Sequence, residues 1–463
     1  MDERALSERS AASSATEQAV AVSTTRGWLI VAVLILGSIL SMLDRQILSL
    51  MVGPIKADLG LSDLQVGLLQ GFAFALFYSL AAVPIGWLVD RAPRGIIAGS
   101  GVILWSIMTG VCGLASTYLQ LFMARMGVGV GEASLGPASH ALIADLFPPA
   151  RMALALSVFG IGSTLGAALA YIIGGQVITA VTANGPFSLP GWGPLATWQV
   201  VFLVVGFPGV LVGILVLAVV VEPRRTRHSH PGGSSTRFRA FAGEHAGLLA
   251  LLMGGIGMLT ATSYASLSWL PAFFDRRFDW APDRAGALLG SLVLFASAPG
   301  GLLCGWLASR WTARGQSIAP LLTMAAAHAA CVPFLAGAFL LPIDRAVVGA
   351  LIIPMLLGSA FVGLGPAVIQ GMTPSALRGR LAATQLLLTN LIGMTLGPLG
   401  VAFLTDHVFQ DEQAVGSSLA VATSAFTLAG VVMLFAATRG YRAVLERAAR
   451  PESAVADPTA RRC

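Results

Sequence analysis

The sequence predicts an all-α integral membrane protein with twelve transmembrane helices in two parallel, pseudo-symmetric six-helix bundles. Three observations lead to this prediction. The 463-residue chain is 56% hydrophobic and 11% charged, whereas a soluble protein carries about 25% charged residues. Its mean hydropathy is +0.80. Apolar runs of roughly 20 residues, the length that crosses a bilayer, recur in two groups of six, and the two groups share repeated sequences.

The apolar runs define two bundles, an N-terminal one at 27–221 and a C-terminal one at 246–438. Some runs contain proline, such as Pro84 and Pro208, which transmembrane helices tolerate as kinks. The runs are 27–50, 64–89, 96–115, 119–143, 152–175 and 199–221 in the first group, and 246–270, 284–308, 317–340, 345–370, 382–404 and 418–438 in the second.

Three polar stretches lie outside the bundles. Residues 1–26 are rich in Ser and Ala and carry both charge signs, which indicates a disordered cytoplasmic tail and not a cleaved signal sequence. Residues 222–245, with Arg, His and Pro-Gly-Gly, are expected to form a cytoplasmic linker between the halves. Residues 439–463 are expected to form a second cytoplasmic tail.

The basic residues predict the orientation. With the N-terminus inside, the cytoplasmic segments carry 21 of the 28 Lys and Arg residues, and the outer loops carry 5. The other two, Arg45 and Arg125, lie within helices. Cytoplasmic loops of membrane proteins are enriched in Lys and Arg, so both termini are predicted to be cytoplasmic. The compact loops indicate a bacterial inner membrane.

The two groups of runs repeat each other. GWLVDRAPRG begins at Gly86, and GWLASRWTARG begins at Gly305, 219 residues later. Gly67 and Gly286 share this offset. Each half has an even number of spans, so both halves insert the same way up, and the arrangement predicts a site between them near the midplane.

Buried charges are the strongest functional signal. Arg125 and Glu132 lie in the fourth run, in RMGVGVGE, two helical turns apart and therefore on one side of the helix. That side must face a partner or a wet cavity, because charges are costly in lipid. At 1.5 Å per residue, Asp44 lies about 25 Å above the cytoplasmic face and Arg125 about 9 Å below the outer face. In a core about 30 Å thick these depths nearly coincide, which predicts an Asp44–Arg125 pair, with Glu132 about 10 Å deeper.

These residues also resemble a known family. Gly86, Asp90, Arg91 and Arg94 are similar to a signature motif of the major facilitator superfamily, and Arg125 resembles part of its second motif. In the second half Ser309 replaces the motif's acid. The stretches that resemble the Spinster branch are LDRQI at 43–47, RMGVGVGEAS at 125–134, IADLF at 143–147, WLPAFF at 269–274 and NLIGMTLGPLGVAFLTD at 390–406.

The resemblance implies a secondary transporter that works by alternating access. Spinster-like proteins are associated with lysophospholipid and sphingolipid transport, and bacterial relatives are thought to couple to protons. The family's functional polar residues match Asp44, Arg125 and Glu132 here.

The predicted roles follow from this match and from the charges. Asp44 and Glu132 are expected to couple protons, because a carboxyl group held between apolar surroundings and an arginine can titrate near neutral pH. Arg125 and Glu132 are expected to contact the substrate. The alternative is a static buried cluster that joins helices one and four. Arg45 directly follows Asp44 and is expected to point elsewhere, either snorkelling to the outer interface or making a second anion contact.

Two further sets of residues complete the prediction. Gly86, Asp90, Arg91 and Arg94 are expected to form a cytoplasmic conformational latch. Polar residues of the second half are expected to line the cavity and bind substrate, and small-residue packing is the alternative for the serine. These residues are Ser263, Tyr264, Trp269 and Asn390.

The sequence therefore predicts a monomeric, proton-coupled transporter of an amphipathic anion such as a lysolipid, surrounded by membrane lipid. A small organic acid such as a sugar acid, or a drug, remains an alternative cargo, and a non-transporting scaffold or receptor is a remote alternative. The four cysteines lack disulfide or metal spacing. No nucleophile cluster or nucleotide-binding loop appears, so no enzyme, metal or cofactor is expected. The dispersed basic residues exclude a nucleic-acid face.

Overall fold

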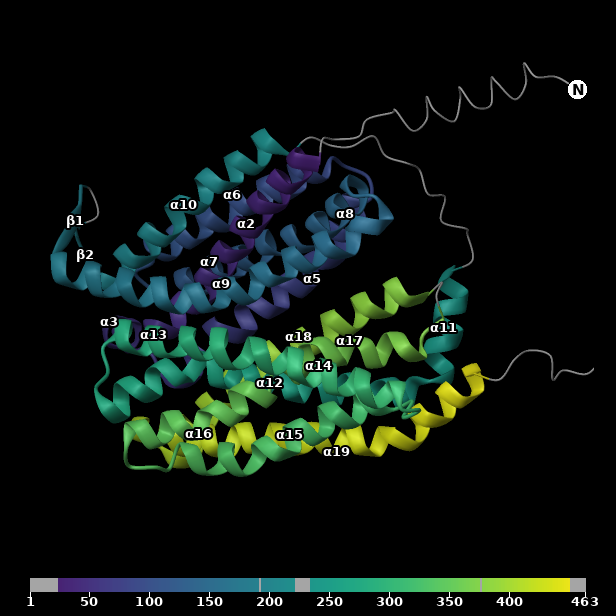
Figure 1. The fold of residues 1–463 in the computed structure, drawn as a ribbon. Coiled ribbons are helices and arrows are strands. Elements are labelled where there is room, and N and C mark those ends of the chain that lie inside the picture. Colours follow the sequence, from purple (N-terminus) through teal and green to yellow (C-terminus); the bar gives the residue numbers. More distant parts are fainter. Residues whose placement is uncertain (1–23, 191–192, 221–233, 375–376, 450–463) are drawn as a thin grey trace, which may run out of the picture. The chain divides into compact units, whose positions relative to one another are not determined.

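The structure is a computed structural model, and it describes residues 24–190, 193–220, 234–374 and 377–449. Nearly all of these residues are helical (Figure 1). In this part of the chain, eleven helices are long and apolar enough to cross a membrane. The remaining predicted run, 119–143, is a helix broken at Ala133 and Ser134. The predicted all-α membrane fold is confirmed, apart from a small hairpin of two strands.

In the first half of the sequence, the described residues form nine α-helices and one π-helical segment, and the last of these helices ends at Val219. Two antiparallel strands, β1 (Phe187–Leu189) and β2 (Gly193–Leu195), form the hairpin. The helices are α2 (Thr24–Leu50), α3 (Val52–Leu59), α4 (Asp63–Gly67), η1 (Leu68–Phe72), α5 (Ala73–Val89), α6 (Arg94–Cys112), α7 (Tyr118–Glu132), α8 (Leu135–Leu146), α9 (Pro149–Asn184) and α10 (Thr197–Val219).

The second half begins with a helix that the sequence did not predict, α11, inside the expected linker. The last helix continues to Ala449, beyond its predicted end at 438. Three stretches of the predicted tails and linker lie outside the described residues: 1–23 of the predicted tail at 1–26, 221–233 at the start of the predicted linker, and 450–463 of the predicted tail at 439–463. The elements are α11 (Ser234–Glu244), α12 (Ala246–Phe278), α13 (Pro282–Leu292), η2 (Val293–Ser297), α14 (Ala298–Ala313), α15 (Ala319–Ala338), α16 (Asp344–Leu357), α17 (Ala360–Met372), α18 (Arg378–Phe403), η4 (Leu404–Phe409), η5 (Glu412–Ala414) and α19 (Val415–Ala449).

The helices form two compact units. Unit 1 consists of the described parts of Met1–Leu61 and Ala73–His230, together with Ala281–Gly290. Within it, α2 packs on α9 and α10, and α6 packs on α7 and α10 (Figure 1). Unit 2 consists of Ser62–Phe72 and the described parts of Pro231–Trp280 and Ser291–Cys463. Within it, α12 packs on α18 and α19, and α15 packs on α16 and α19.

Each unit includes one segment from the other half of the sequence, and glycines make the close contacts there. A Cβ atom on Gly71 would lie 2.2 Å from the carbonyl oxygen of Met394 in unit 2. A Cβ atom on Gly290 would lie 2.5 Å from the carbonyl oxygen of Ala168 in unit 1. Gly71 and Gly290 are 219 residues apart, the offset of the sequence repeat. The repeat therefore keeps glycine where two backbones touch.

Polar contacts fix the beginning of α4 within unit 2. The guanidinium of Arg276 donates two hydrogen bonds of 2.7 Å, one to each carboxylate oxygen of Asp63, which is fully buried. The Asp406 carboxylate accepts hydrogen bonds from the backbone N–H groups of Asp63 and Leu64, at 3.3 and 2.6 Å. A carboxylate at a helix N-terminus satisfies backbone donors that have no partner inside the helix.

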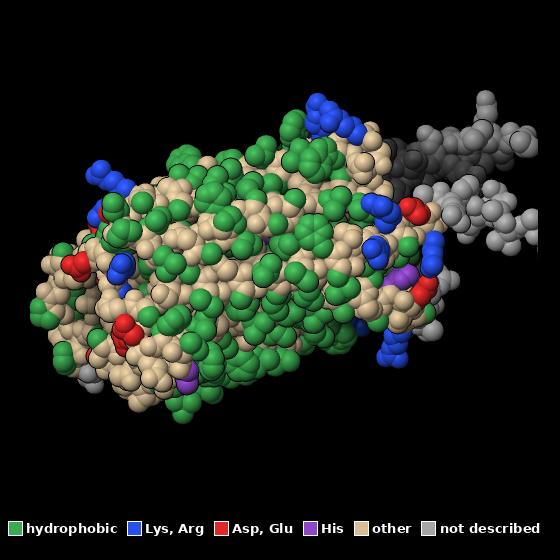
Figure 2. All heavy atoms as spheres, turned by 90° about the horizontal axis from the view of Figure 1, so that it is seen from below, with side chains coloured by type: hydrophobic (Ala, Val, Ile, Leu, Met, Phe, Trp, Pro, Cys, Tyr) green, Lys and Arg blue, Asp and Glu red, His purple; other side chains and the backbone are tan. Residues whose placement is uncertain are grey.

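The surface of unit 2 has the polarity expected of a membrane protein. Figure 2 shows hydrophobic side chains spread over the middle of one face, with charged side chains gathered near its two ends. Several large apolar side chains are mostly exposed, among them Leu302 at 77% and Val362 at 65%. Exposed apolar side chains at this density mark a surface that contacts lipid.

Candidate functional site

The site is built where α7 approaches α5 and α6 within unit 1. The sequence RMGVGVGE supplies glycines on the sides of α7 that face these helices. A Cβ atom on Gly129 would lie 2.7 Å from the carbonyl oxygen of Phe74, and one on Gly131 would lie 2.7 Å from the backbone nitrogen of Trp105. Glycine therefore allows the close packing that buries Arg125 and Glu132, and α7 ends at Glu132.

Glu132 is the centre of the buried charges. Its Oε2 atom accepts hydrogen bonds from the Ser41 hydroxyl at 2.7 Å and from Arg45 Nε at 2.7 Å. Arg45 Nη2 lies 2.6 Å from the same oxygen, which makes an ion pair. The Glu132 side chain has 0% exposure and that of Arg45 has 16%. Within the described residues, Glu132 Oε1 is buried without a hydrogen-bond partner.

Asp44 and Arg125 lie next to each other but do not form the predicted ion pair. Arg125 Nη1 donates a 3.3 Å hydrogen bond to the backbone carbonyl oxygen of Asp44. The Asp44 carboxylate accepts a 3.1 Å hydrogen bond from the hydroxyl of Thr109 on α6. Both charged side chains are almost fully buried. Asp44 and Arg125 therefore lie close together, as their depths predict, but the arginine contacts the backbone of α2 and not the carboxylate.

Arg45 is the site residue that the sequence argument placed wrongly. It does not point away from the cluster, because it pairs with Glu132. Its guanidinium also lies over the rings of Phe74 and Tyr78 on α5, 4.6 and 5.5 Å from their centroids. Ser41 and Arg45 are four residues apart and so share a helix face. The four-residue spacing and the length of the arginine side chain are the features of the sequence that could have predicted that Ser41 and Arg45 contact the same group.

The predicted latch residues lie at the α5–α6 turn. Arg94 forms an ion pair with Asp145 on α8 and donates a 3.3 Å hydrogen bond to the carbonyl oxygen of Ala141. Arg91 donates to the carbonyl oxygen of Trp87 and lies over its ring. The sequence does not predict Asp145, which lies in IADLF, as the partner of Arg94. Gly86 faces open space, since a Cβ atom there would have no neighbour within 4 Å.

The predicted second-half residues lie on α12 and α18 of unit 2. Ser263, Tyr264 and Asn390 are partly exposed. Trp269 is fully buried, and its indole N–H donates a 3.0 Å hydrogen bond to the carbonyl oxygen of Pro398. That contact joins α12 to α18. Among the described residues, no group of His, Cys, Asp and Glu is arranged to hold a metal ion.

Comparison with known proteins identifies the family. The model of the Major Facilitator Superfamily matches residues 34–398, most of the chain. The chain belongs to the major facilitator superfamily. It is therefore a membrane transporter and not an enzyme, and it lies in the Spinster-like branch.

Two Spinster relatives support the branch. A crystal structure of a bacterial homolog of the human lysosomal transporter Spinster, inward-facing and unoccupied, has a TM-score of 0.75 and 25% sequence identity. The match covers 92% of this chain and 98% of that one. The sphingosine-1-phosphate transporter SPNS2 of Danio rerio is 32% identical over 203 residues, 43% of this chain and 37% of that protein.

A third relative matches over nearly the whole length. An MFS-type efflux pump of Mycolicibacterium smegmatis is 28% identical over 429 residues, which is 90% of this chain and 94% of that protein. The relatives of this chain thus include both a sphingosine-1-phosphate transporter and an MFS-type efflux pump.

Proposed function

We propose that this transporter couples protons to the movement of an amphipathic anion by alternating access. The observation that carries the proposal is a cluster of four charges on α2 and α7, of which three are buried and the fourth, Arg45, is partly buried. Asp44, Arg45, Arg125 and Glu132 sum to zero charge when both acids are ionised. One added proton leaves a net positive charge in a buried site, which is costly. An anion that enters restores neutrality, so proton and anion binding favour each other.

Glu132 is suited to take up the proton. All three donors that contact it converge on Oε2, and Oε1 has no partner in the described part of the chain. A proton on Oε1 displaces none of these donors. It removes the negative charge that attracts Arg45 and so weakens the contact between α2 and α7. We propose that Asp44 is the second proton-coupling residue. Its carboxylate accepts a hydrogen bond from the Thr109 hydroxyl.

Arg125 is suited to bind the anion. Its Nη1 donates a hydrogen bond to the carbonyl oxygen of Asp44. Among the described residues, its Nε has no hydrogen-bond partner, and no carboxylate forms an ion pair with its guanidinium. A guanidinium recognises phosphate or carboxylate through paired N–H groups. The Phe74 ring lies 5.7 Å from it, so the surroundings are partly apolar. A charged head with an apolar remainder fits these surroundings, and the Danio rerio relative is named for such a lipid phosphate.

We also propose supporting roles for the other predicted residues. Ser263, Tyr264 and Asn390 contact the substrate from the second half, and Trp269 acts through packing. Arg94, with Asp90, Arg91 and Gly86, forms the latch. The proposed location is a bacterial inner membrane with both termini cytoplasmic, and the uneven distribution of Lys and Arg supports this orientation. The transporter is proposed to work as a monomer.

The test is substrate-driven proton uptake in proteoliposomes that contain the purified protein. Glu132→Gln and Asp44→Asn are expected to abolish uptake while each variant still folds. Asp279→Asn is a matched control, because this exposed acid has a φ of 53°, a backbone conformation that Asn tolerates. Uptake that persists in both site variants overturns the coupling role.

The substrate class is tested by ligand-induced shifts of the melting temperature. A lysolipid phosphate is expected to stabilise the wild type, and Arg125→Met is expected to lose this shift while Arg125→Lys keeps part of it. The match to a relative named as an efflux pump, over 90% of this chain, supports a test of export, and the second candidate cargo is an apolar drug. Stabilisation by neutral drugs that is unchanged in Arg125→Met would support this candidate, and a sugar acid serves as the small-anion comparison.

A further inference from the structure

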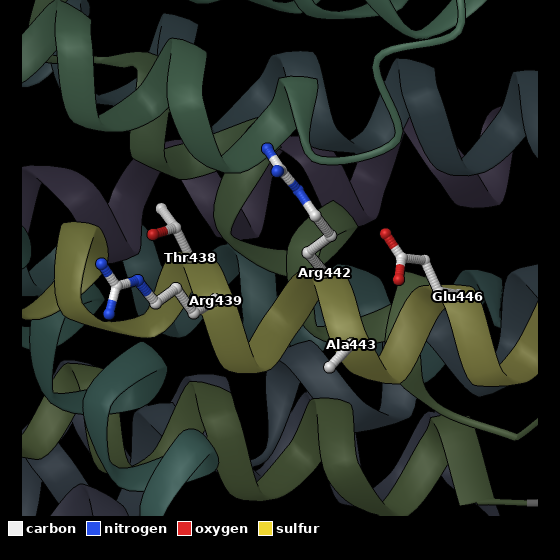
Figure 3. A pocket seen from close by; sticks show the side chains of 5 residues that line it. All are labelled: Thr438, Arg439, Arg442, Ala443 and Glu446. Atoms are coloured by element: carbon white, nitrogen blue, oxygen red, sulfur yellow. The ribbon is translucent and has the colours of Figure 1, made fainter.

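A pocket in unit 2 lies near the end of α19. Its volume is about 240 Å³, and Thr438, Arg439, Arg442, Ala443 and Glu446 line it. These residues recur at helical spacing and therefore share one side of α19. Figure 3 shows Arg442 and Glu446 extending to the same side of the helix, with Thr438 and Arg439 one turn earlier.

The pocket continues the lipid-facing side of α19. Four large apolar side chains along the helix are about half exposed, at positions separated by three, four or seven residues and thus on one face. They are Val421, Leu428, Val432 and Phe435. The next positions on this face are Arg439, Arg442 and Glu446. The exposed face changes from apolar to charged within about one turn, as expected where lipid hydrocarbon ends and headgroups begin.

The opposite face of the same segment is firmly anchored. Tyr441 is 2% exposed and belongs to the hydrophobic core of unit 2. Val444 and Leu445 pack against this core, together with Phe238 and Phe241 of α11. The end of α19 is therefore held in place by its buried side, and the pocket residues keep a defined position on the outer side.

The two arginines of the pocket are available for a ligand. Both side chains are exposed, and neither forms an ion pair or a side-chain hydrogen bond with another residue in the described part of the chain. The Thr438 hydroxyl donates to the carbonyl oxygen of Phe435 and can still accept. With Glu446, the pocket carries a net charge of +1, which matches a single phosphodiester better than a multiply charged free phosphate.

We propose that this pocket binds the headgroup of a membrane glycerophospholipid in the cytoplasmic leaflet of the proposed orientation. Arg439 and Arg442 bind the phosphodiester through paired N–H groups. Glu446 accepts hydrogen bonds from donors on the headgroup, which are the hydroxyl groups of glycerol or the ammonium of ethanolamine. The continuity of the pocket with the lipid-facing stripe selects a lipid as the occupant.

The experiment measures lipid binding to the purified full-length protein by native mass spectrometry. The protein is titrated with phosphatidylglycerol, phosphatidylethanolamine, phosphatidylcholine and inorganic phosphate. The double variant R439Q/R442Q is compared with R310Q/R314Q, which removes two exposed arginines near the end of α14. The wild type and the R310Q/R314Q control are expected to bind phosphatidylglycerol or phosphatidylethanolamine equally, and R439Q/R442Q at least fivefold more weakly.

Each outcome decides the proposal without reference to transport. Equal weakening in R310Q/R314Q would mean general electrostatic attraction and overturn the site. Inorganic phosphate that binds as tightly as lipid would also overturn it. Glu446→Gln is expected to reduce the preference for phosphatidylglycerol or phosphatidylethanolamine over phosphatidylcholine, and an unchanged preference contradicts the role of Glu446. Because no substrate or proton flux is measured, failure here leaves the proposed transport mechanism intact.

Discussion

The ion pair between Arg45 and Glu132 gives the sharpest stability prediction. Removing one member of a buried pair typically costs about 3–5 kcal/mol, because the remaining charge has no compensation. The Arg45 side chain keeps 16% exposure while Glu132 keeps none, so we expect about 3 kcal/mol for Arg45→Met, at the low end of that range. For a unit of about 200 residues, this lowers the melting temperature by roughly 6–12 °C.

A double-mutant cycle separates the pair from other effects. Glu132→Gln removes hydrogen bonds to a charged acceptor, for which we expect about 2 kcal/mol. The variant R45M/E132Q removes both charges of the pair and is expected to lose little more stability than Glu132→Gln alone, which gives a coupling energy of about 2–3 kcal/mol. Thermal unfolding followed by tryptophan fluorescence measures all four proteins, and exposed Arg277→Met is the control. Additive losses, with the double variant about 5 kcal/mol below the wild type, refute the pairing.

Three other predictions concern contacts away from this pair. Gly71→Ala is expected to cost about 1–3 kcal/mol of stability, because it forces a Cβ atom against a carbonyl oxygen of α18. Gly86→Ala is the control, since a Cβ atom there has no neighbour within 4 Å and should leave the melting temperature unchanged. Equal effects of the two substitutions on the melting temperature contradict the close packing at Gly71. Arg276→Met removes both charge-assisted hydrogen bonds to the buried Asp63 carboxylate and is expected to cost about 3–5 kcal/mol, and a change below about 1 kcal/mol counts against this estimate. Asp145→Asn breaks a partly exposed pair and is expected to cost less than about 1 kcal/mol, so a large loss of stability in the same unfolding assay argues against this estimate.

The parts of the fold that depend on local composition could be predicted from the sequence. Length and hydropathy predicted the spans, and the repeat at Gly67 and Gly286 indicated two related halves. The break after Glu132 was missed, because an apolar run of sufficient length shows no interruption. Helix α11 could not be predicted because its sequence has too few apolar residues to stand out. Its apolar residues Phe238 and Phe241 lie among polar ones, and their packing on the hydrophobic core of unit 2 explains the helix.

Three of the four clustered charges could be placed near one another from the sequence, but Arg45 and the pairing of the charges could not. Helical spacing and depth placed Asp44, Arg125 and Glu132 near one another, which the structure bears out in unit 1. The depth of a residue in the membrane does not tell how its helix is rotated about its own axis. Arg125 was therefore predicted to pair with the Asp44 carboxylate, whereas it contacts the Asp44 backbone carbonyl oxygen. Arg45 was missed because successive helical residues point about 100° apart, and a long side chain can span that difference.

The second half of the chain forms the same kind of helical bundle without the buried charges of the first half, which indicates that the fold does not need these charges. Glycines recur at the repeat offset where backbones touch, as at Gly71 and Gly290. The charges do not recur, since Asp44 and Arg45 correspond to Ser263 and Tyr264. If the ion pair served only to hold helices together, an uncharged replacement of both partners that still folds would leave substrate-driven proton uptake unchanged. We expect R45M/E132Q to remain folded near the stability of Glu132→Gln yet to lose substrate-driven proton uptake, and a folded double variant with normal uptake would show that the pair is a structural element alone.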